Sequence, residues 1–207
     1  MRQRAWLHKG NKLYVADRGC LVEIDITSAK IIRRIHLAGS QFINDVAAAP
    51  NGDIFISDTF TDTIYRLTRN GKMEVFFASK RLEYPNGLWV DGNKLIIATW
   101  GPMINRATFE TSRKGTLKSL DLTTKKLSNI GAGLPIANMD AVVKYGENYY
   151  ASDWVGGRLL QIDKEGKVKV LLTGFSQFAD LGLNKQTGTL MMPEMSSNRV
   201  FTYQIKQ

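Results

Sequence analysis

The sequence predicts an all-β protein with the architecture of a β-propeller. Asp17, Asp58 and Thr99 follow one another at intervals of 41 residues, and the same interval separates Asp153 from Glu194. Each of these residues ends a short apolar run, and no long stretch shows the period of an amphipathic helix. A repeat of about 41 residues is typical of the four-stranded blades of propellers. Only the step from Thr99 to Asp153 is longer, at 54 residues.

Each repeat has the pattern of an antiparallel meander. The segments 21–26 and 31–37 alternate apolar and polar residues, and the turns 50–52 and 70–71 contain the Asn-Gly pair of tight hairpins. One propeller domain is therefore expected over 1–207, with blade units at about 1–38, 42–79, 83–131, 137–174 and 178–207. The strands expected in these units are 4–8, 12–17, 21–27 and 31–37; 45–49, 53–58, 63–67 and 73–78; 87–90, 94–100, 115–122 and 126–130; 141–145, 148–153, 158–163 and 168–173; and 181–184, 189–194 and 200–205.

The fifth unit lacks a fourth strand, and no N-terminal strand is left over to complete it. Either the five units close unaided, or the chain is a shortened member of a family with one more blade, which is the reading we favour. Sheets with two apolar faces must stack against their neighbours. The large aromatic residues are expected to fill these contacts between blades, with an aromatic binding platform as the alternative; they are Phe55, Trp89, Trp100, Tyr150, Trp154 and Phe201.

Polar residues recur where the innermost strand of each unit begins. Counting back 13 residues from the strand-end positions gives Asp45, Asn86 and Asp140, and Asp180 takes the same place if the turn after Asn184 is one residue longer. These four side chains should meet at one end of the central channel. Carboxylate and amide oxygens suit Ca²⁺, Mg²⁺ or Mn²⁺. Alternatively, the four residues only cap the loops that enter each blade.

Composition excludes several other functions. The formal charge is +9, but the basic residues are scattered through all the repeats, which argues against specific nucleic-acid binding. One cysteine and two histidines leave no disulfide, histidine zinc site or Ser-His-Asp triad to expect. No segment has the length and hydrophobicity of a membrane span or signal peptide. The chain as written is expected to be cytoplasmic, or periplasmic or secreted if an upstream signal segment is missing. Open blade edges allow self-association.

The extra length of the third unit lies in the connection 101–114, which contains Met103, Arg106 and Phe109. A long connection on one rim of a repeat array is a common place for a binding loop, and a tolerated surface excursion is the alternative.

Several motifs together resemble one propeller family. Asn44-Asp45, the Pro85-Asn86-Gly87-Leu88 segment, Met139-Asp140 and the strand end Ala151-Ser152-Asp153-Trp154 are similar to motifs of the SMP-30/gluconolactonase/LRE-like family, and NHL-repeat and paraoxonase-like propellers share part of this pattern. The resemblance implies a six-bladed propeller that binds a divalent cation in its channel and hydrolyses lactones. The implied cation is Ca²⁺, with Mg²⁺, Mn²⁺ or Zn²⁺ as alternatives.

The resemblance also implies roles for particular residues. Asn86 and Asp140 match metal ligands, and Asp140 also matches the acid/base group. Asn44 matches a substrate or metal contact, and Asp62 lies near an acidic substrate contact; Asp45 and Asp180 are further candidates for substrate binding. The family's first-blade glutamate has no counterpart, and Phe42 replaces an arginine that contacts substrate.

Two functions are therefore carried forward. The first is a lactonase-like hydrolase that uses a divalent cation in the channel. The alternative is a non-catalytic propeller that binds a small ligand or a protein at the channel mouth and the 101–114 loop.

Overall fold

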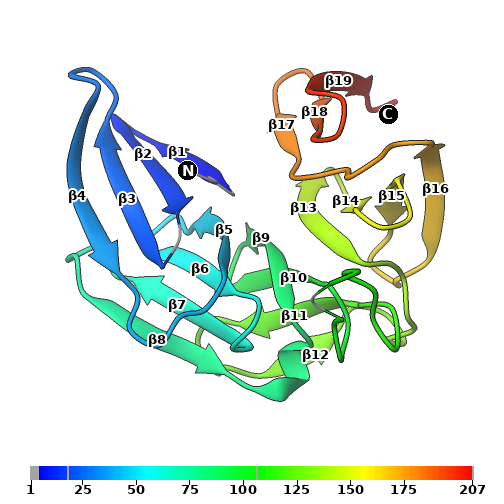
Figure 1. Cartoon of the computed structure of the whole chain (residues 1–207), viewed down its shortest axis with the longest axis horizontal. Helices are drawn as coiled ribbons and strands as arrows, with labels where there is room; N and C mark the ends of the chain where they lie inside the picture. Colours follow the sequence, from blue (N-terminus) through cyan, green and yellow to red (C-terminus); the bar gives the residue numbers. More distant parts are fainter. Residues whose placement is uncertain (1–4, 18, 106, 207) are drawn as a thin grey trace.

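The computed structural model describes residues 5–17, 19–105 and 107–206 and confirms the all-β propeller. Five antiparallel sheets follow one another around a central axis in chain order (Figure 1). The helical structure in the described residues is one short 3₁₀ turn, Lys80–Leu82, so no described helix could cross a bilayer. The predicted first strand falls partly on Arg4, which lies outside the described residues.

The strands begin and end as follows. The first sheet contains β1 (Trp6–Lys9), β2 (Lys12–Asp17), β3 (Cys20–Asp25) and β4 (Lys30–His36); the second contains β5 (Ile43–Ala48), β6 (Ile54–Asp58), β7 (Thr63–Leu67) and β8 (Met73–Ala78); the third contains β9 (Pro85–Asp91), β10 (Lys94–Thr99), β11 (Leu117–Asp121) and β12 (Leu127–Asn129); the fourth contains β13 (Met139–Tyr145), β14 (Asn148–Asp153), β15 (Arg158–Ile162) and β16 (Val168–Thr173); and the fifth contains β17 (Gly182–Asn184), β18 (Thr189–Glu194) and β19 (Arg199–Gln204).

The repeat positions found in the sequence are equivalent positions in the fold. Asp17, Asp58, Thr99, Asp153 and Glu194 are the last residues of β2, β6, β10, β14 and β18, the second strand of each sheet. The fifth sheet has three strands, as expected, and among the described strands no ladder joins it to the first sheet. Self-association through the blade edges stays a prediction.

The hydrophobic core lies between neighbouring sheets. Alternate residues of one strand enter different clusters: Ile54 and Ile56 pack toward the first sheet, whereas Phe55 between them packs toward the third. In the same way Ile96 packs toward the fourth sheet and Ile97 toward the second. Both faces of an inner sheet are therefore buried, which explains why a single blade cannot be stable alone.

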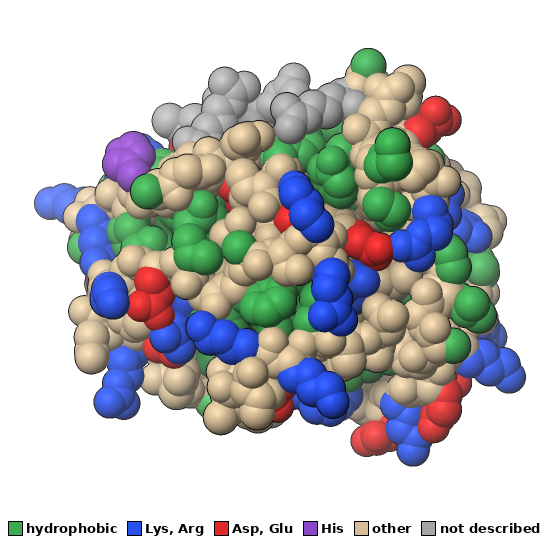
Figure 2. Space-filling view, turned by 90° about the horizontal axis from the view of Figure 1, so that it is seen from below, with side chains coloured by type: hydrophobic (Ala, Val, Ile, Leu, Met, Phe, Trp, Pro, Cys, Tyr) green, Lys and Arg blue, Asp and Glu red, His purple; other side chains and the backbone are tan. Residues whose placement is uncertain are grey.

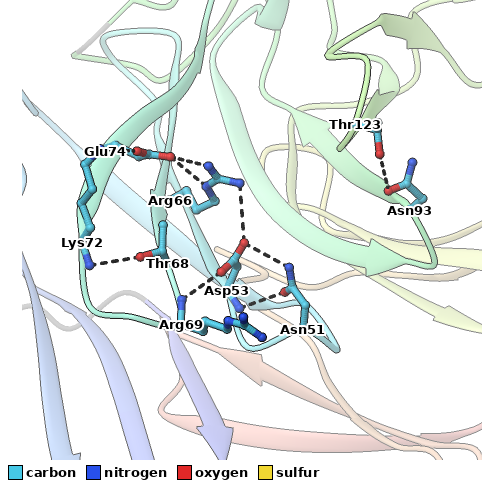
Figure 3. Close-up of polar contacts among 9 residues, drawn as sticks. All are labelled: Asn51, Asp53, Arg66, Thr68, Arg69, Lys72, Glu74, Asn93 and Thr123. Atoms are coloured by element: carbon cyan, nitrogen blue, oxygen red, sulfur yellow. Dashed lines mark hydrogen bonds and ion pairs between the residues drawn. The ribbon is translucent and has the colours of Figure 1, made fainter.

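Local polar contacts join the turns of the second sheet. In the second sheet Asp53 accepts a hydrogen bond from the backbone N–H of Arg69 (2.9 Å) and from Asn51 Nδ2 (3.1 Å), and it lies 3.6 Å from the Arg66 guanidinium (Figure 3). Arg66 also pairs with Glu74.

The basic side chains are spread singly over the side of the molecule seen in Figure 2, among uncharged and acidic ones. This distribution agrees with a solvated basic surface.

The innermost strands approach each other closely enough to require a glycine. A Cβ at Gly87 in β9 would lie 2.6 Å from the Cα of Ala141 and 2.7 Å from the carbonyl oxygen of Asp140 in β13. The Ser57 hydroxyl makes a second link between sheets, because it accepts from the Asp45 N–H (2.9 Å) and donates to the Asn86 carbonyl (2.8 Å). These contacts set the spacing of the channel residues.

We expect Gly87→Ala to destabilise the protein by roughly 1–3 kcal/mol, because the new methyl group meets backbone that cannot move away without separating two blades. Gly182→Ala is the matched control: its Cβ would meet the flexible end of Met191, with Cε at 2.9 Å. Thermal unfolding of both variants measures the difference. Equal melting temperatures would contradict the close packing of β9 on β13.

Candidate functional site

A cavity of about 890 Å³ opens at the end of the channel where the second strands finish. Its walls come from the second to fifth sheets and from the 101–114 connection. Five of the lining residues are aromatic, five are polar and three are aliphatic or Met. They are Phe42, Phe60, Trp100, Phe109 and Trp154; Asn44, Thr59, Asn86, Asp140 and Gln177; and Ile104, Ala179 and Met195.

One wall of the cavity is a cluster of three aromatic rings. The ring centroids of Trp100 and Trp154 are 5.5 Å apart, Phe109 lies 5.5 Å from Trp154, and Trp100 lies 6.2 Å from Phe109. Such separations are those of favourable aromatic pairs. Trp100 follows a strand of the third sheet and Trp154 a strand of the fourth, so their contact joins neighbouring blades, as expected. Both rings also line the cavity and lie outside the five core clusters.

The connection 101–114 is part of this wall and is firmly held. The Trp100 indole N–H donates to the Phe109 carbonyl (2.8 Å). Asn138, which is fully buried, donates to the Trp100 carbonyl (2.7 Å) and to the Thr111 hydroxyl (2.8 Å). Phe109 has a left-handed backbone with φ of 60°, a conformation that costs free energy in a non-glycine residue. The loop thus places Phe109 and Ile104 against the cavity; Arg106 lies outside the described residues.

Phe42 and Phe60 form a second aromatic wall. Their ring centroids are 4.5 Å apart, and Phe60 lies 6.4 Å from Tyr84. Phe42 is the residue that stands where the resemblance leads one to expect an arginine. An apolar ring therefore lines the cavity at this position in place of a charged group.

The floor of the cavity is polar. Asn86 Nδ2 donates to Asp140 Oδ1 (3.0 Å), and Asn44 Nδ2 donates to the Thr59 hydroxyl (3.1 Å). Asn86 and Asp140 come from β9 and β13, the strands that pack closely at Gly87. The structure thus brings together Asn44, Asn86 and Asp140 on one surface.

Two more carboxyl groups lie close to this floor. Asp45 is buried and accepts from the N–H groups of Leu88 (2.6 Å) and Val46 (2.7 Å). Burial, followed by the negative charge of Asp180 and then that of Asp140, raises the pKa of Asp45 well above its usual value. Burial also raises the pKa of Asp180 to about 6. Asp45 therefore lies near enough to Asp180 and Asp140 to be affected by their charges, and Asn86 contacts Asp140.

Asp62 has a different environment. Its side chain is buried, accepts from the Tyr84 N–H (2.7 Å) and pairs with Lys80 (3.0 Å), and it does not line the cavity. These contacts join the second sheet to the segment before β9, and a role in substrate binding stays a prediction. Asp58 and Asp153 make structural contacts: Asp58 accepts from the Phe42 N–H (2.8 Å), and Asp153 pairs with Arg158 (2.6 Å).

The polar floor offers only part of the ligand set of a divalent cation. Asp140, Asn86 and Asn44 offer hard oxygen atoms, which fit Ca²⁺, Mg²⁺ or Mn²⁺ better than Zn²⁺. Among the described residues, however, no group of three or more His, Cys, Asp and Glu side chains is arranged for a metal ion. Both Asp45 oxygens already accept backbone hydrogen bonds. A cation on this floor would need water or a ligand for most of its coordination.

Four of the lining residues occupy the same position of the repeat, a regularity that could have predicted them from the sequence. Thr59, Trp100, Trp154 and Met195 each follow the strand-end position of their unit, and all four line the cavity. In each case the backbone N–H bonds to the residue two or three positions before the innermost strand's polar position, with N–O distances of 2.9–3.2 Å. The acceptors are Phe42, Tyr84, Asn138 and Gln177.

Comparison with known proteins supports the fold alone. No protein-family model matches the chain, and no curated protein matches its sequence. Among solved structures 1161 chains match, so the similarity is to a widely used architecture. One is a chain of a crystal structure of a nidogen/laminin complex, with a TM-score of 0.68 and 13% identity over 98% of this chain and 80% of that chain. The described residues thus form a β-propeller of five blades.

We expect Asp180→Asn to stabilise the protein at pH 8 and to have little effect at pH 4. The folded state holds the Asp180 proton more tightly than the unfolded chain, so stability is lost as the pH rises from about 4 to about 6. The loss is at most about 3 kcal/mol. Thermal unfolding at both pH values, with Glu147→Gln as an exposed charge control, measures it. A variant that is less stable at pH 8 would contradict this electrostatic environment.

Proposed function

We propose that the protein binds a small organic molecule at the channel mouth. The cavity of about 890 Å³ with aromatic walls and a polar floor is the observation that carries this proposal. Ligand pockets of this size are typically apolar with a few convergent polar groups.

The walls and the floor would contact different parts of the ligand. Trp100, Phe109 and Trp154 would hold the apolar body of the ligand, since aromatic contacts combine large buried area with few rotatable bonds. Asn44 and Asn86 would orient its polar group by hydrogen bonds from their amides. The Asn138 contacts hold the Trp100 backbone, and the Trp100 indole N–H bonds to the Phe109 carbonyl, so this part of the wall would need little ordering on binding.

Calorimetric titration with dihydrocoumarin, a neutral aromatic lactone, tests this proposal. We expect Trp154→Ala to weaken binding about tenfold, because about 1.4 kcal/mol of ring contact is lost. Trp6→Ala, which removes an exposed Trp outside the cavity, should leave the affinity unchanged. Absence of binding to the native protein, or equal affinities of the two variants, would argue against the cavity as the site.

A second candidate function is lactone hydrolysis. The specific observation in its favour is the Asn86–Asp140 hydrogen bond on the cavity floor, since the family resemblance assigns these two residues to the metal and acid/base positions. Asn86 and Asp140 would hold a divalent cation, which when bound supplies a Lewis acid for an ester carbonyl. Asp140 would exchange the proton, and the aromatic walls would limit the access of water.

This candidate predicts Ca²⁺-dependent opening of dihydrocoumarin, followed by absorbance of the phenol product. Asp140→Asn should reduce kcat at least a hundredfold, because general acid–base groups contribute on that scale. Glu147→Gln removes an exposed charge from the β13–β14 turn at the other end of the strand and should retain activity. Binding without turnover, in the presence and absence of Ca²⁺, would exclude hydrolysis and leave the binding function.

A further inference from the structure

We propose that a second cavity, at the two outer strands of the third sheet, binds a phosphate group, either free or carried on a small molecule. This cavity has a volume of about 220 Å³. It shares no described lining residue with the cavity at the channel mouth, so the inference stands apart from the function proposed above. The lining comes from the segment before β9 and from β11 and β12: Arg81, Glu83, Lys118, Leu127, Ser128 and Asn129.

Lys118 is a buried cation in the wall of this cavity. Its side chain is 8% exposed, an unusual degree of burial for a lysine. Its Nζ lies 3.1 Å from Glu83 Oε2 and donates to Asn129 Oδ1 (3.3 Å). An ammonium group has three N–H donors, and Glu83 and Asn129 are its two partners among the described residues. At least one donor of Lys118 therefore remains for a ligand.

Glu83 is the one acidic residue in the described lining, and two cations already contact it. Lys118 lies at Oε2, and Arg113 from the 101–114 connection contacts Oε1. Glu83 has a left-handed backbone with φ of 55°, a conformation that costs free energy and persists where the surrounding contacts fix it. The carboxylate is thus held between Lys118 and Arg113 and balances only one of their two charges.

Arg81 adds a further positive charge at the cavity. Its Nη2 makes one long hydrogen bond, to the Leu127 carbonyl (3.5 Å), and within the described residues no carboxylate pairs with it. Arg81, Arg113 and Lys118 are three cations, and Glu83 is one anion, which leaves a local charge of +2. A phosphate dianion carries the opposite charge, and a guanidinium group can bond two of its oxygens at once.

The other polar groups of the lining add hydrogen-bond donors. Asn129 uses its side-chain oxygen for Lys118, which leaves its amide N–H groups as donors. The Ser128 hydroxyl makes a long bond to the Ser119 carbonyl (3.4 Å) and can turn toward a ligand. A phosphate group accepts on several oxygens together, whereas a cation would be repelled by the local charge. The lining therefore fits a phosphate group.

Calorimetric titration of the unmodified protein at pH 8 and low salt tests the inference. The probes are inorganic phosphate and glycerol 3-phosphate, with sodium chloride at equal ionic strength as the baseline. We expect saturable binding at a single site. Similar affinities would show that the phosphate group alone is recognised, and tighter binding of glycerol 3-phosphate would identify a phosphate monoester as the ligand. Either result supports the site, and no saturable binding of either probe would overturn it.

A matched pair of variants locates the bound anion. Arg81→Gln should weaken phosphate binding at least tenfold, because it removes a charged donor pair at the cavity. Arg69→Gln removes an exposed arginine from a turn of the second sheet outside the cavity and changes the net charge equally. This control should retain the affinity. Unchanged affinity in Arg81→Gln, or equal losses in the two variants, would overturn the assignment.

Two further variants complete the test. Lys118→Met should also weaken phosphate binding at least tenfold. Circular dichroism shows whether this variant folds without one of the Glu83 partners, and the two arginine variants remain decisive if it does not. Trp154→Ala alters the channel-mouth cavity and should leave phosphate binding unchanged, so failure of either proposal leaves the other intact. A loss of phosphate affinity in Trp154→Ala but not in Arg81→Gln would place the anion at the channel mouth and overturn the inference.

Discussion

The close approach of β9 to β13 is the contact on which the site depends. Gly87 lets the two innermost strands meet at backbone distance, and the residues just before Gly87 and Ala141 are therefore brought into hydrogen-bonding range. The Asn86–Asp140 contact of 3.0 Å is a direct consequence. A propeller generates such a meeting point because each blade is stable only when it is stacked on its neighbours. Stability and the geometry of the cavity floor thus have the same origin.

The repeat made most of the architecture predictable. Asp58 and its counterparts end equivalent strands because each blade repeats one backbone plan, and the count back from them correctly places Asp45, Asn86, Asp140 and Asp180 near one another. Successive side chains of a strand point to opposite faces of the sheet. Ile54 and Ile56 are therefore buried on one face of the second sheet and Phe55 on the other. These features follow from local rules repeated five times.

The cavity walls were less predictable, for a physical reason. A Trp at a strand end can pack between blades or turn over the channel, and hydrophobicity favours both. The position of Trp100 at the cavity depends on its hydrogen bonds with Asn138 and Phe109 and on the bond from Asn138 to Thr111. These contacts join residues far apart in sequence. Asp62 shows the same limit, because only the fold reveals that Lys80 and the Tyr84 backbone occupy its carboxylate.

Binding at the aromatic wall is the central claim, and the four Trp residues of the chain allow a direct measurement. In a spectrum of ¹⁵N-labelled protein each Trp gives one indole N–H signal, so Trp100 and Trp154 at the cavity can be compared with Trp6 and Trp89 outside it. On titration with dihydrocoumarin, we predict that the Trp100 and Trp154 signals shift with one common dissociation constant while the other two stay in place. Shifts confined to Trp6 or Trp89, or no shift in any of the four at saturating dihydrocoumarin, would contradict binding at the aromatic wall.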